Sequence, residues 1–460
     1  MDELRTKLFY EPENGYDQID TKERVEAEKY AAKYMEFLDV SRTEREAVNR
    51  AIEEAEAQGF VQYSPGMELR PGLKIYSNNR GRALILAVIG KKPLDEGVVI
   101  AGAHIDSPRL DLKQVTMYES DELCYFKTHY YGGIKKYQWV AIPLELHGVV
   151  ALKSGELIEV SIGREPGEPK FVITDIMPHL AADQVKKTLA EGFTGEGLNI
   201  LIGSTPYDDG GKDRVKLAVL SLLQDMYGIT EEDFISAELC AVPAFDVSEI
   251  GLDRSLIGGY GQDDRVCAYA QLKALFDIVE PERTCVCVLV DKEEIGSEGV
   301  ASMQSAAFDS FMADLCASQN ILLRRCYENS FCLSADVCSA FDPLYPEISE
   351  KRSSAKINYG VGISKYTGSR GKAATNDASA ELVAYLRHIF EKHSVVWQMA
   401  ELGKVDQGGG GTIAKFMARR NIDTIDAGVP MLSMHAPFEV VAKLDSYMMY
   451  KSVLALYRGE

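Results

Sequence analysis

Two of the seven histidines in this chain directly follow apolar runs that are typical of buried strands. His104 stands in AGAHIDSP, and His435 stands in MLSMHAPFE. Open α/β sheets bind ligands beyond the carboxyl ends of their strands, so both imidazoles lie where a metal or a substrate could bind. A lone histidine at a strand end is more often a structural hydrogen-bonding group. The neighbouring residues must therefore decide between the two interpretations.

Carboxylates accompany these histidines. Asp106 lies two residues after His104, on the same side of an extended segment, where it could accept the imidazole N–H and orient the ring. Glu293 and Glu294 follow the apolar run 285–290, and adjacent carboxylates at such a place repel each other unless a cation compensates. With a metal, one could bind the ion while the other takes a proton from water. The alternative is a solvated acidic loop.

Further carboxylates stand at two other element ends. Asp263 and Asp264 precede a predicted helix, where one Asp could simply be an N-cap, and Asp336 ends the run FCLSAD. Two imidazoles and at least three carboxylates suit divalent ions, with zinc favoured and manganese or cobalt as alternatives. One carboxylate of the 263–264 pair could bridge two metals. These residues predict a two-metal hydrolytic site.

Other catalytic motifs are missing. The run Gly408 to Gly411 precedes a helix, but the chain has no GxxxxGK[ST] motif, so a nucleotide site is not predicted. We interpret these glycines, with Gly410 as a substrate-contact candidate, either as backbone close to a substrate or as a hinge. The chain also has no G-x-S-x-G elbow and no recognisable cysteine nucleophile.

The elements around these residues predict an α/β fold. Asp20 with Glu23, and Ser41 with Glu44, predict two N-capped helices. Continuous apolar runs predict strands buried on both faces, followed by helices with apolar residues at every third or fourth position. Between them, alternating strands and turns predict a β-rich insertion. We expect one domain from 1–112 and 248–460, interrupted by a second from 113–247. The segment 342–375 is predicted to be a long connection beside the site.

Composition limits the classes of protein that remain. A net charge of -20 repels phosphate backbones, so nucleic acid is not expected as a partner. No apolar run approaches membrane-spanning length, and the first ten residues have no signal-like apolar core. The nine cysteines form no C-x-x-C pair and suit reduced thiols. We therefore expect a cytoplasmic protein without a membrane partner.

The motifs AHIDSPRLDLK, DKEEIGSEG, the SAD at Asp336 and MHAPFE occur in the order and spacing of the aspartyl aminopeptidase family of zinc metallopeptidases. The resemblance covers nearly the whole chain and is closer to the bacterial members. It implies an α/β, phosphorylase/hydrolase-like metallopeptidase domain with an inserted β-rich dimerisation domain. It also implies dimers that assemble into a dodecameric shell.

Carried over by position, the resemblance implies two zinc ions per subunit bridged by Asp263. His104 and Asp336 would complete one metal site, and Glu294 and His435 the other. Glu293 would be the general base, while Asp106 orients a ligand. Many relatives have Asn where this chain has Asp264, so the role of Asp264 stays open.

The resemblance also favours peptides with an acidic N-terminal residue, Asp or Glu, whose side chain needs a cation. The candidates are Lys365, Arg370 and Lys372 in ISKYTGSRGK, with Lys365 in the best register; the alternative is a solvated basic loop. In the family, a residue of the inserted domain reaches the active site of a neighbouring subunit. The segment around His179 resembles that region, although Asp183 is the residue that aligns with the reaching His of the animal members. The strongly negative chain also makes a broader specificity credible.

Two other kinds of function are compatible with the fold. A related two-metal amidohydrolase would cleave substrates with a blocked N-terminus. A catalytically silent assembly or cargo protein would have lost ligands or the base, and none of the predicted ones is missing here.

Overall fold

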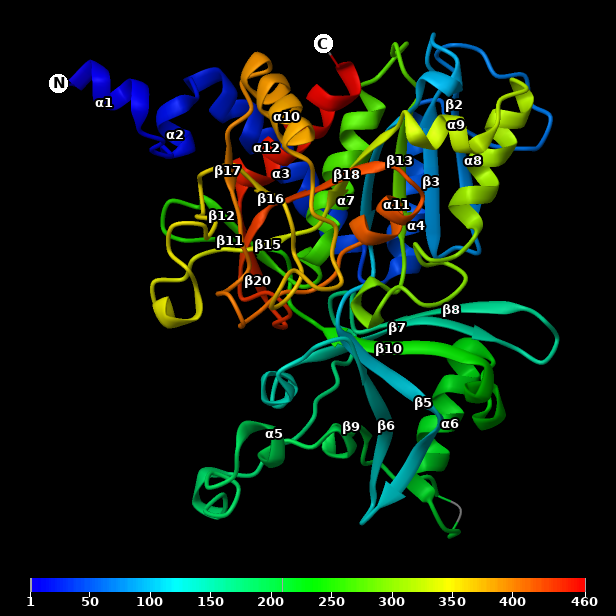
Figure 1. The fold of residues 1–460 in the computed structure, drawn as a ribbon. Coiled ribbons are helices and arrows are strands. Elements are labelled where there is room, and N and C mark those ends of the chain that lie inside the picture. Colours follow the sequence, from blue (N-terminus) through cyan, green and yellow to red (C-terminus); the bar gives the residue numbers. More distant parts are fainter. Residues whose placement is uncertain (1, 209, 460) are drawn as a thin grey trace.

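The computed structural model describes residues 2–208 and 210–459. Their strands form three sheets, of which the largest is a nine-stranded sheet in the upper body of Figure 1. In spatial order its strands are β1 (Val61–Gln62), β2 (Lys74–Asn79), β3 (Ala83–Val88), β13 (Cys285–Val290), β4 (Val99–His104), β14 (Phe331–Ala335), β18 (Asp423–Gly428), β16 (Val361–Ser364) and β17 (Trp397–Met399).

The four central strands of this sheet, β13, β4, β14 and β18, run parallel to one another. Their carboxyl ends therefore meet at one edge of the sheet, which is the edge where open α/β sheets bind ligands. The residues that follow these four ends are the ones that can form a common site.

Helices cover both faces of the sheet. Successive residues of one strand belong to different cores: Cys285 and Cys287 face the first core, whereas Val286 and Val288 face the second. Burial on both sides explains the continuous apolar runs of these strands. The first core contains α3 (Thr21–Val40), α4 (Glu44–Ala57), α7 (Gln262–Phe276), α10 (Ala380–Lys392) and α12 (Lys443–Arg458). The second contains α8 (Ala307–Ser318), α9 (Leu323–Glu328) and α11 (Ala414–Arg419).

A six-stranded antiparallel sheet, built from residues 109–243, lies below this body in Figure 1. Its strands, in spatial order, are β8 (Leu157–Ile162), β7 (Leu144–Ala151), β10 (Ala237–Pro243), β5 (Arg109–Ser120), β6 (Leu123–Tyr131) and β9 (Ile200–Gly203). Helix α6 (Arg214–Tyr227) packs on it and contributes to a third core, and the short α5 (Leu189–Gly192) lies in a projecting segment. We call this sheet the second sheet.

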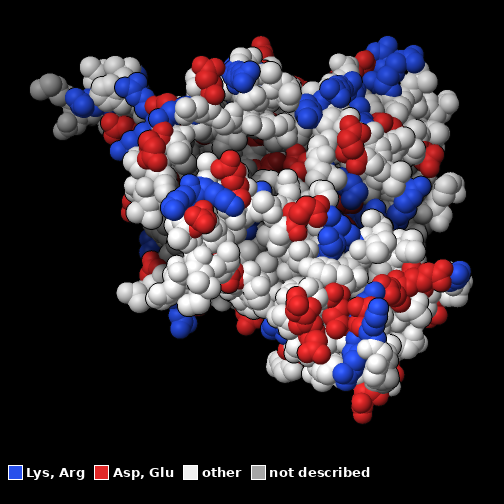
Figure 2. Space-filling view, turned by 90° about the horizontal axis from the view of Figure 1, so that it is seen from below, with Lys and Arg blue, Asp and Glu red and all other residues white. Residues whose placement is uncertain are grey.

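A third, five-stranded sheet connects the end of the second sheet to α7 and α12. Its strands are β11 (Ser248–Ile250), β12 (Leu256–Gly259), β20 (Glu439–Ala442), β19 (Pro430–Leu432) and β15 (Cys338–Ser339). Two short helices, α1 (Asp2–Leu8) and α2 (Gly15–Gln18), begin the chain. Within the described residues, no helix combines the length and apolar character needed to cross a membrane. On the face shown in Figure 2, basic and acidic side chains are interspersed.

Two local predictions are wrong in detail. The second capped helix begins with Thr43 as its N-cap, in a reciprocal capping box with Glu46, and not with Ser41. Both pairs have the spacing of a capping box, and tertiary packing selects between them. The segment 342–375 is not only a connection, because its residues Val361–Ser364 form β16 of the main sheet. A four-residue strand surrounded by polar residues is too short for its pattern to be recognised.

Candidate metal centre

The ends of the parallel strands bring the predicted ligands together. His104 is the last residue of β4, Asp336 follows β14, and Glu294 lies in a short helix, Glu293–Ile295, just after β13. Three groups of residues could each hold a metal ion, because the ligand atoms within each group lie within 4.8 Å of one another. The groups are His104, Glu293 and Asp336; His104, Asp263 and Glu294; and Asp263, Asp264 and Asp336. Neighbouring parallel strands thus create the cluster from residues far apart in the sequence.

Asp263 lies between the two imidazoles. Its Oδ1 is 3.1 Å from His104 Nε2, and its Oδ2 is 3.2 Å from His435 Nε2. The same His435 nitrogen is 3.3 Å from Glu294 Oε1, and His104 Nε2 is 3.8 Å from Asp336 Oδ1. Each imidazole therefore has the shared Asp263 carboxylate and a second, separate carboxylate beside it.

Asp106 makes contacts beyond the predicted one with His104. The nearest acceptor for His104 Nδ1 is the main-chain oxygen of Asp106 at 3.0 Å, while the carboxylate is 3.4 Å away. The buried carboxylate also accepts hydrogen bonds from the backbone N–H groups of Glu293, at 3.1 Å, and Glu294, at 3.2 Å. Asp106 thus orients the ring through its backbone and holds the two glutamates through its side chain.

The charges of the cluster favour a divalent cation. Burial, and then the negative charge of Asp263, raises the pKa of Glu294 well above its usual range. Burial and the charge of Asp264 do the same to the pKa of Asp336. Glu294 Oε1 is buried without a hydrogen bond, although it lies close to His435. A bound cation would offset both the burial and the repulsion, and imidazole with carboxylate ligands suits zinc. The residues present therefore fit a metal site.

Glu293 is in a different electrostatic position from Glu294. Burial is the main cause that raises its pKa to about 7, while the nearby His104 opposes the shift. A carboxylate whose pKa lies near neutral pH is suited to accept and return a proton. This matches the role that the sequence predicts for it.

Asp264 is joined to Asp263 by a cis peptide bond and is fully buried. Apart from the nearby thiol of Cys267, its carboxylate oxygens have no hydrogen-bond partner among the described residues, and burial raises its pKa well above the usual range. The group is thus held close to the ligand cluster in an environment that favours its neutral form.

Sequence patterns did not single out two groups that hold the cluster in place. Glu439 accepts hydrogen bonds from the backbone N–H of His435 at 2.8 Å and of Asp263 at 3.1 Å, so one carboxylate links two candidate ligands. Glu439 is the last residue of the MHAPFE motif, four residues after His435, but the motif by itself assigned it no role. The second group is the end of β6, where the Gly133 carbonyl accepts from His435 Nδ1 at 2.9 Å. No sequence signal relates this glycine to the site.

A cavity of about 280 Å³ opens beside the cluster. Apart from the candidate ligands and Glu293, its walls include apolar, glycine and neutral polar residues and the buried Asp426. The main ones are Val337, Ser339, Ser364, Tyr366, Thr367, Leu402, Gly409, Gly410, Gly411, Thr412, Asp426 and Met434. None of the described lining residues is a Lys or an Arg. The cavity is large enough for a side chain of a substrate.

The four predicted substrate contacts lie in different places. Gly410 lines the cavity. Lys365 and Lys372 do not, and both point to Asp377, with Nζ at 3.7 and 3.1 Å from its carboxylate. His179 is exposed in a short helix, Pro178–Leu180, of the second-sheet region. The structure therefore brings one of the four to the metal-ligand cluster.

The fold and the cluster together define a class. The chain has a mixed α/β fold with imidazoles and carboxylates at the ends of adjacent parallel strands. Beside them lie a carboxyl group of near-neutral pKa and a cavity. These features together define a metal-dependent hydrolase.

Comparison with known proteins narrows this class. The profile of the aminopeptidase I zinc metalloprotease (M18) family matches residues 37–457. A probable M18 family aminopeptidase 1 from Clostridium acetobutylicum is 48% identical over 96% of this chain and 97% of its own length. The crystal structure of an M18 aminopeptidase from Thermotoga maritima superposes with a TM-score of 0.94 and 42% identity, covering 98% and 100% of the two chains. The S. cerevisiae mApe1 dodecamer, at 20% identity and a TM-score of 0.76 over 93% and 96%, shares the fold.

This chain belongs to the aminopeptidase I zinc metalloprotease (M18) family. It is therefore a metallo-aminopeptidase, an exopeptidase that removes residues from the N-terminus of peptides.

Proposed function

We propose that the protein is a two-zinc aminopeptidase in which Asp263 bridges the metals. His104 and Asp336 complete one site, and Glu294 and His435 complete the other. The observation that carries this proposal is the position of the Asp263 carboxylate, with one oxygen beside each imidazole. A carboxylate between two separate His–carboxylate pairs has the arrangement that a bridging ligand requires.

In this proposal Glu293 is the general base. Zinc, when bound, polarises the scissile carbonyl and acidifies water at the site. Glu293 takes the proton from the attacking water and returns it to the leaving amine. Asp106 fixes the backbone of Glu293, and Glu439 fixes the backbones of Asp263 and His435. These contacts keep base and ligands in one geometry.

We propose that the enzyme prefers peptides whose first residue has an uncharged or basic side chain over peptides whose first residue is acidic. The acidic preference expected from the sequence depends on Lys365, which pairs with Asp377 outside the cavity lining. Asp426 also lines the cavity; its carboxyl group accepts hydrogen bonds from Ser334 and Thr412, and burial raises its pKa to about 6. In its ionised form this group would repel an acidic side chain.

A peptide panel tests both parts of the proposal. The chelated enzyme should be inactive and should recover when zinc is restored. Peptides with a free N-terminus should be cleaved and their N-acetylated forms should not. Among free peptides, those that begin with Leu or Lys should have a kcat/KM at least about tenfold above those that begin with Asp. Lys365→Ala should leave this order unchanged.

Each part of the panel can fail separately. Cleavage of acetylated peptides would identify an amidohydrolase in place of an aminopeptidase, and full activity after chelation would exclude the metal mechanism. Inactivity with every peptide and metal would favour an assembly protein. A preference for Asp that disappears in Lys365→Ala would restore the acidic pocket.

The second-sheet region, residues 113–247, is proposed to mediate dimer contacts and, through them, a dodecamer. The segment around α5 projects from the body in Figure 1 and carries five exposed apolar side chains: Ile176, Met177, Leu180, Val185 and Leu189. Exposed apolar groups on a projecting segment are typical of a protein interface. The mApe1 structure supports the larger assembly, because it is a dodecamer with this fold. His179 lies within the same segment.

Light scattering of the Leu180→Asp, Val185→Asp double variant tests this assembly. The wild-type chain should have the mass of twelve subunits, and the variant should dissociate to a smaller species. A matched pair of exposed apolar residues on α6, outside the projecting segment, is Leu222→Asp with Met226→Asp, and this variant should keep the wild-type mass. A monomeric wild-type protein, or an unchanged mass in the apolar variant, would contradict the proposed interface.

We propose that the protein is cytoplasmic, because of the state of its cysteines. All nine cysteines are free, and eight of them are buried. Cysteines used in this way suit a reducing environment.

A further inference from the structure

We propose that the segment 131–133, which begins at the last residue of β6, is a positioning element of the catalytic centre, with Tyr131 acting through Asp106. The Tyr131 hydroxyl donates a 2.6 Å hydrogen bond to Asp106 Oδ2. Two residues later the Gly133 carbonyl accepts the bond from His435 Nδ1. The last residue of β6 and the glycine two residues after it thus contact both halves of the proposed metal site. The inference rests on the proposed roles of Glu293, Glu294 and His435.

Tyr131 is the side-chain donor that completes the contacts of Asp106. The Asp106 carboxylate has no exposed surface and accepts three hydrogen bonds, two from the backbone of Glu293 and Glu294 and one from Tyr131. Burial, and then the charge of Asp106, raises the pKa of Tyr131 far above neutral, so its hydroxyl remains a donor. Without that hydroxyl, a buried carboxylate loses one of its three partners, and the loop that carries the base and a ligand is held less firmly.

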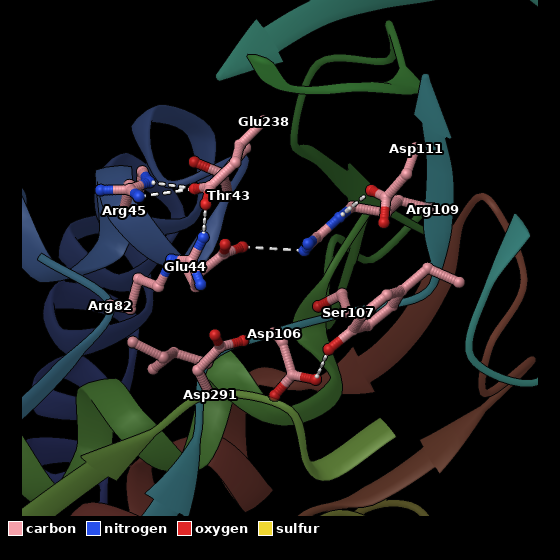
Figure 3. Close-up of polar contacts among 12 residues, drawn as sticks. Thr43, Glu44, Arg45, Arg82, Asp106, Ser107, Arg109, Asp111, Glu238 and Asp291 are labelled. Carbon is pink, nitrogen blue, oxygen red and sulfur yellow. Dashed lines mark hydrogen bonds and ion pairs between the residues drawn. The ribbon is translucent and has the colours of Figure 1, made fainter. Parts of the chain in front are cut away.

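Tyr131 is itself held by a buried ion-pair network, which Figure 3 shows above Asp106. The Arg109 guanidinium lies 4.3 Å from the centroid of the Tyr131 ring. Arg109 donates from Nη1 to Glu44 Oε2 at 2.8 Å and from Nε to Asp111 Oδ1 at 2.7 Å. Because Arg109 and Glu44 are buried, this cation–π contact is not exposed to solvent, where it would be weak. The network connects α4, β5 and β6 to the loop of Glu293.

The two glycines after Tyr131 allow the backbone to come close to the ligands. Gly132 has a φ of +73°, and a Cβ there would lie 3.4 Å from both Glu294 Cβ and Pro108 Cγ. A Cβ on Gly133 would lie 3.4 Å from His435 Nδ1. The segment therefore lies within van der Waals reach of a ligand from each of two distant segments, and the positive φ of Gly132 favours glycine there.

Tyr131→Phe tests the inference, with Tyr130→Phe as the matched control. Phe keeps the ring over which Arg109 lies and removes only the hydroxyl. We expect kcat to fall about tenfold or more with KM within about twofold of wild type, and zinc affinity, measured by competition with a chelator, to fall about tenfold. Tyr130 belongs to the same strand but is exposed, so Tyr130→Phe should match wild type in all three quantities.

Glu44→Gln gives an independent second variant. It keeps the shape of the side chain but weakens the anchor of Arg109, so kcat and zinc affinity should fall in the same direction by a smaller factor. Thermal unfolding of each variant separates a structural effect from a positioning effect. A lower unfolding temperature with unchanged kcat and zinc affinity in Tyr131→Phe would overturn the inference. If the wild type lacked zinc-dependent peptidase activity, the proposed function would fail, and the affinity measurement on the same variants would still decide the role of Tyr131.

Discussion

Glu293→Gln is expected to lower kcat by about 10²- to 10⁴-fold while the metal content of the protein stays at the wild-type level. Gln has the shape of Glu but cannot accept the proton of the attacking water. Glu293 lines the cavity beside the ligand cluster, and in the proposed ligand set it binds neither metal, so its replacement should affect proton transfer more than metal binding. Peptidase assays and metal analysis of the same purified sample measure both quantities.

The matched control for this variant is Glu298→Gln. Glu298 lies in the same loop but is exposed and accepts a hydrogen bond from Gln304, so its replacement should leave activity and metal content unchanged. Glu293 also belongs to a possible ligand group with His104 and Asp336. Loss of metal together with activity in Glu293→Gln would therefore make it a ligand, and retained activity would exclude it as the base.

Asp263→Asn is also expected to have a large effect. The variant should lose metal from both proposed sites and should have no peptidase activity. The two oxygens of Asp263 lie 3.1 and 3.2 Å from the imidazoles of His104 and His435, and the neighbouring imidazoles hold the pKa of Asp263 low against the effect of burial. An amide has no negative charge to share between two cations. The loss of affinity should exceed the roughly 10- to 100-fold cost of removing a contact outside the ligand shell. Titration of the chelated protein with zinc measures it.

Asp264→Asn is the natural control for Asp263→Asn, since both replace a buried carboxyl group with an amide of the same size. Burial already favours the neutral form of Asp264, so the change of charge is small and the protein should keep its metal. If Asp264→Asn lost zinc and Asp263→Asn kept it, the assignment of the bridging residue would move by one position. Equal losses would make both carboxylates ligands.

Much of the fold follows from local patterns, and the errors have local causes. The run 285–290 is β13 as predicted, and Cys285 and Cys287 face one core, because alternation along a strand is a property of the backbone. Asp20 caps α3 through Glu23 as predicted. Thr43 replaces Ser41 as the cap of α4, since two overlapping motifs compete there and only packing distinguishes them. Tertiary contacts therefore affect where a helix or strand begins and ends more than they affect whether a segment is a helix or a strand.

The sequence alone determined which residue types stand at the ends of the strands: the imidazoles of His104 and His435, the carboxylates beside them, and the pair Glu293 and Glu294. Their chemistry requires a cation wherever they meet, because buried like charges repel. The order of motifs along the chain was enough to indicate the M18 family, which the comparisons show.

Only the tertiary structure decided what surrounds those residues. It placed Lys365 against Asp377 and left the cavity lining without a Lys or an Arg among its described residues. It also brought Tyr131 and Gly133 from the second sheet to Asp106 and His435. Such contacts join residues far apart in the sequence, and they depend on how the sheets pack, for which spacing along the chain carries no signal. The residues at strand ends can therefore be predicted from sequence. The residues that position those ligands, or that select the substrate beside them, cannot.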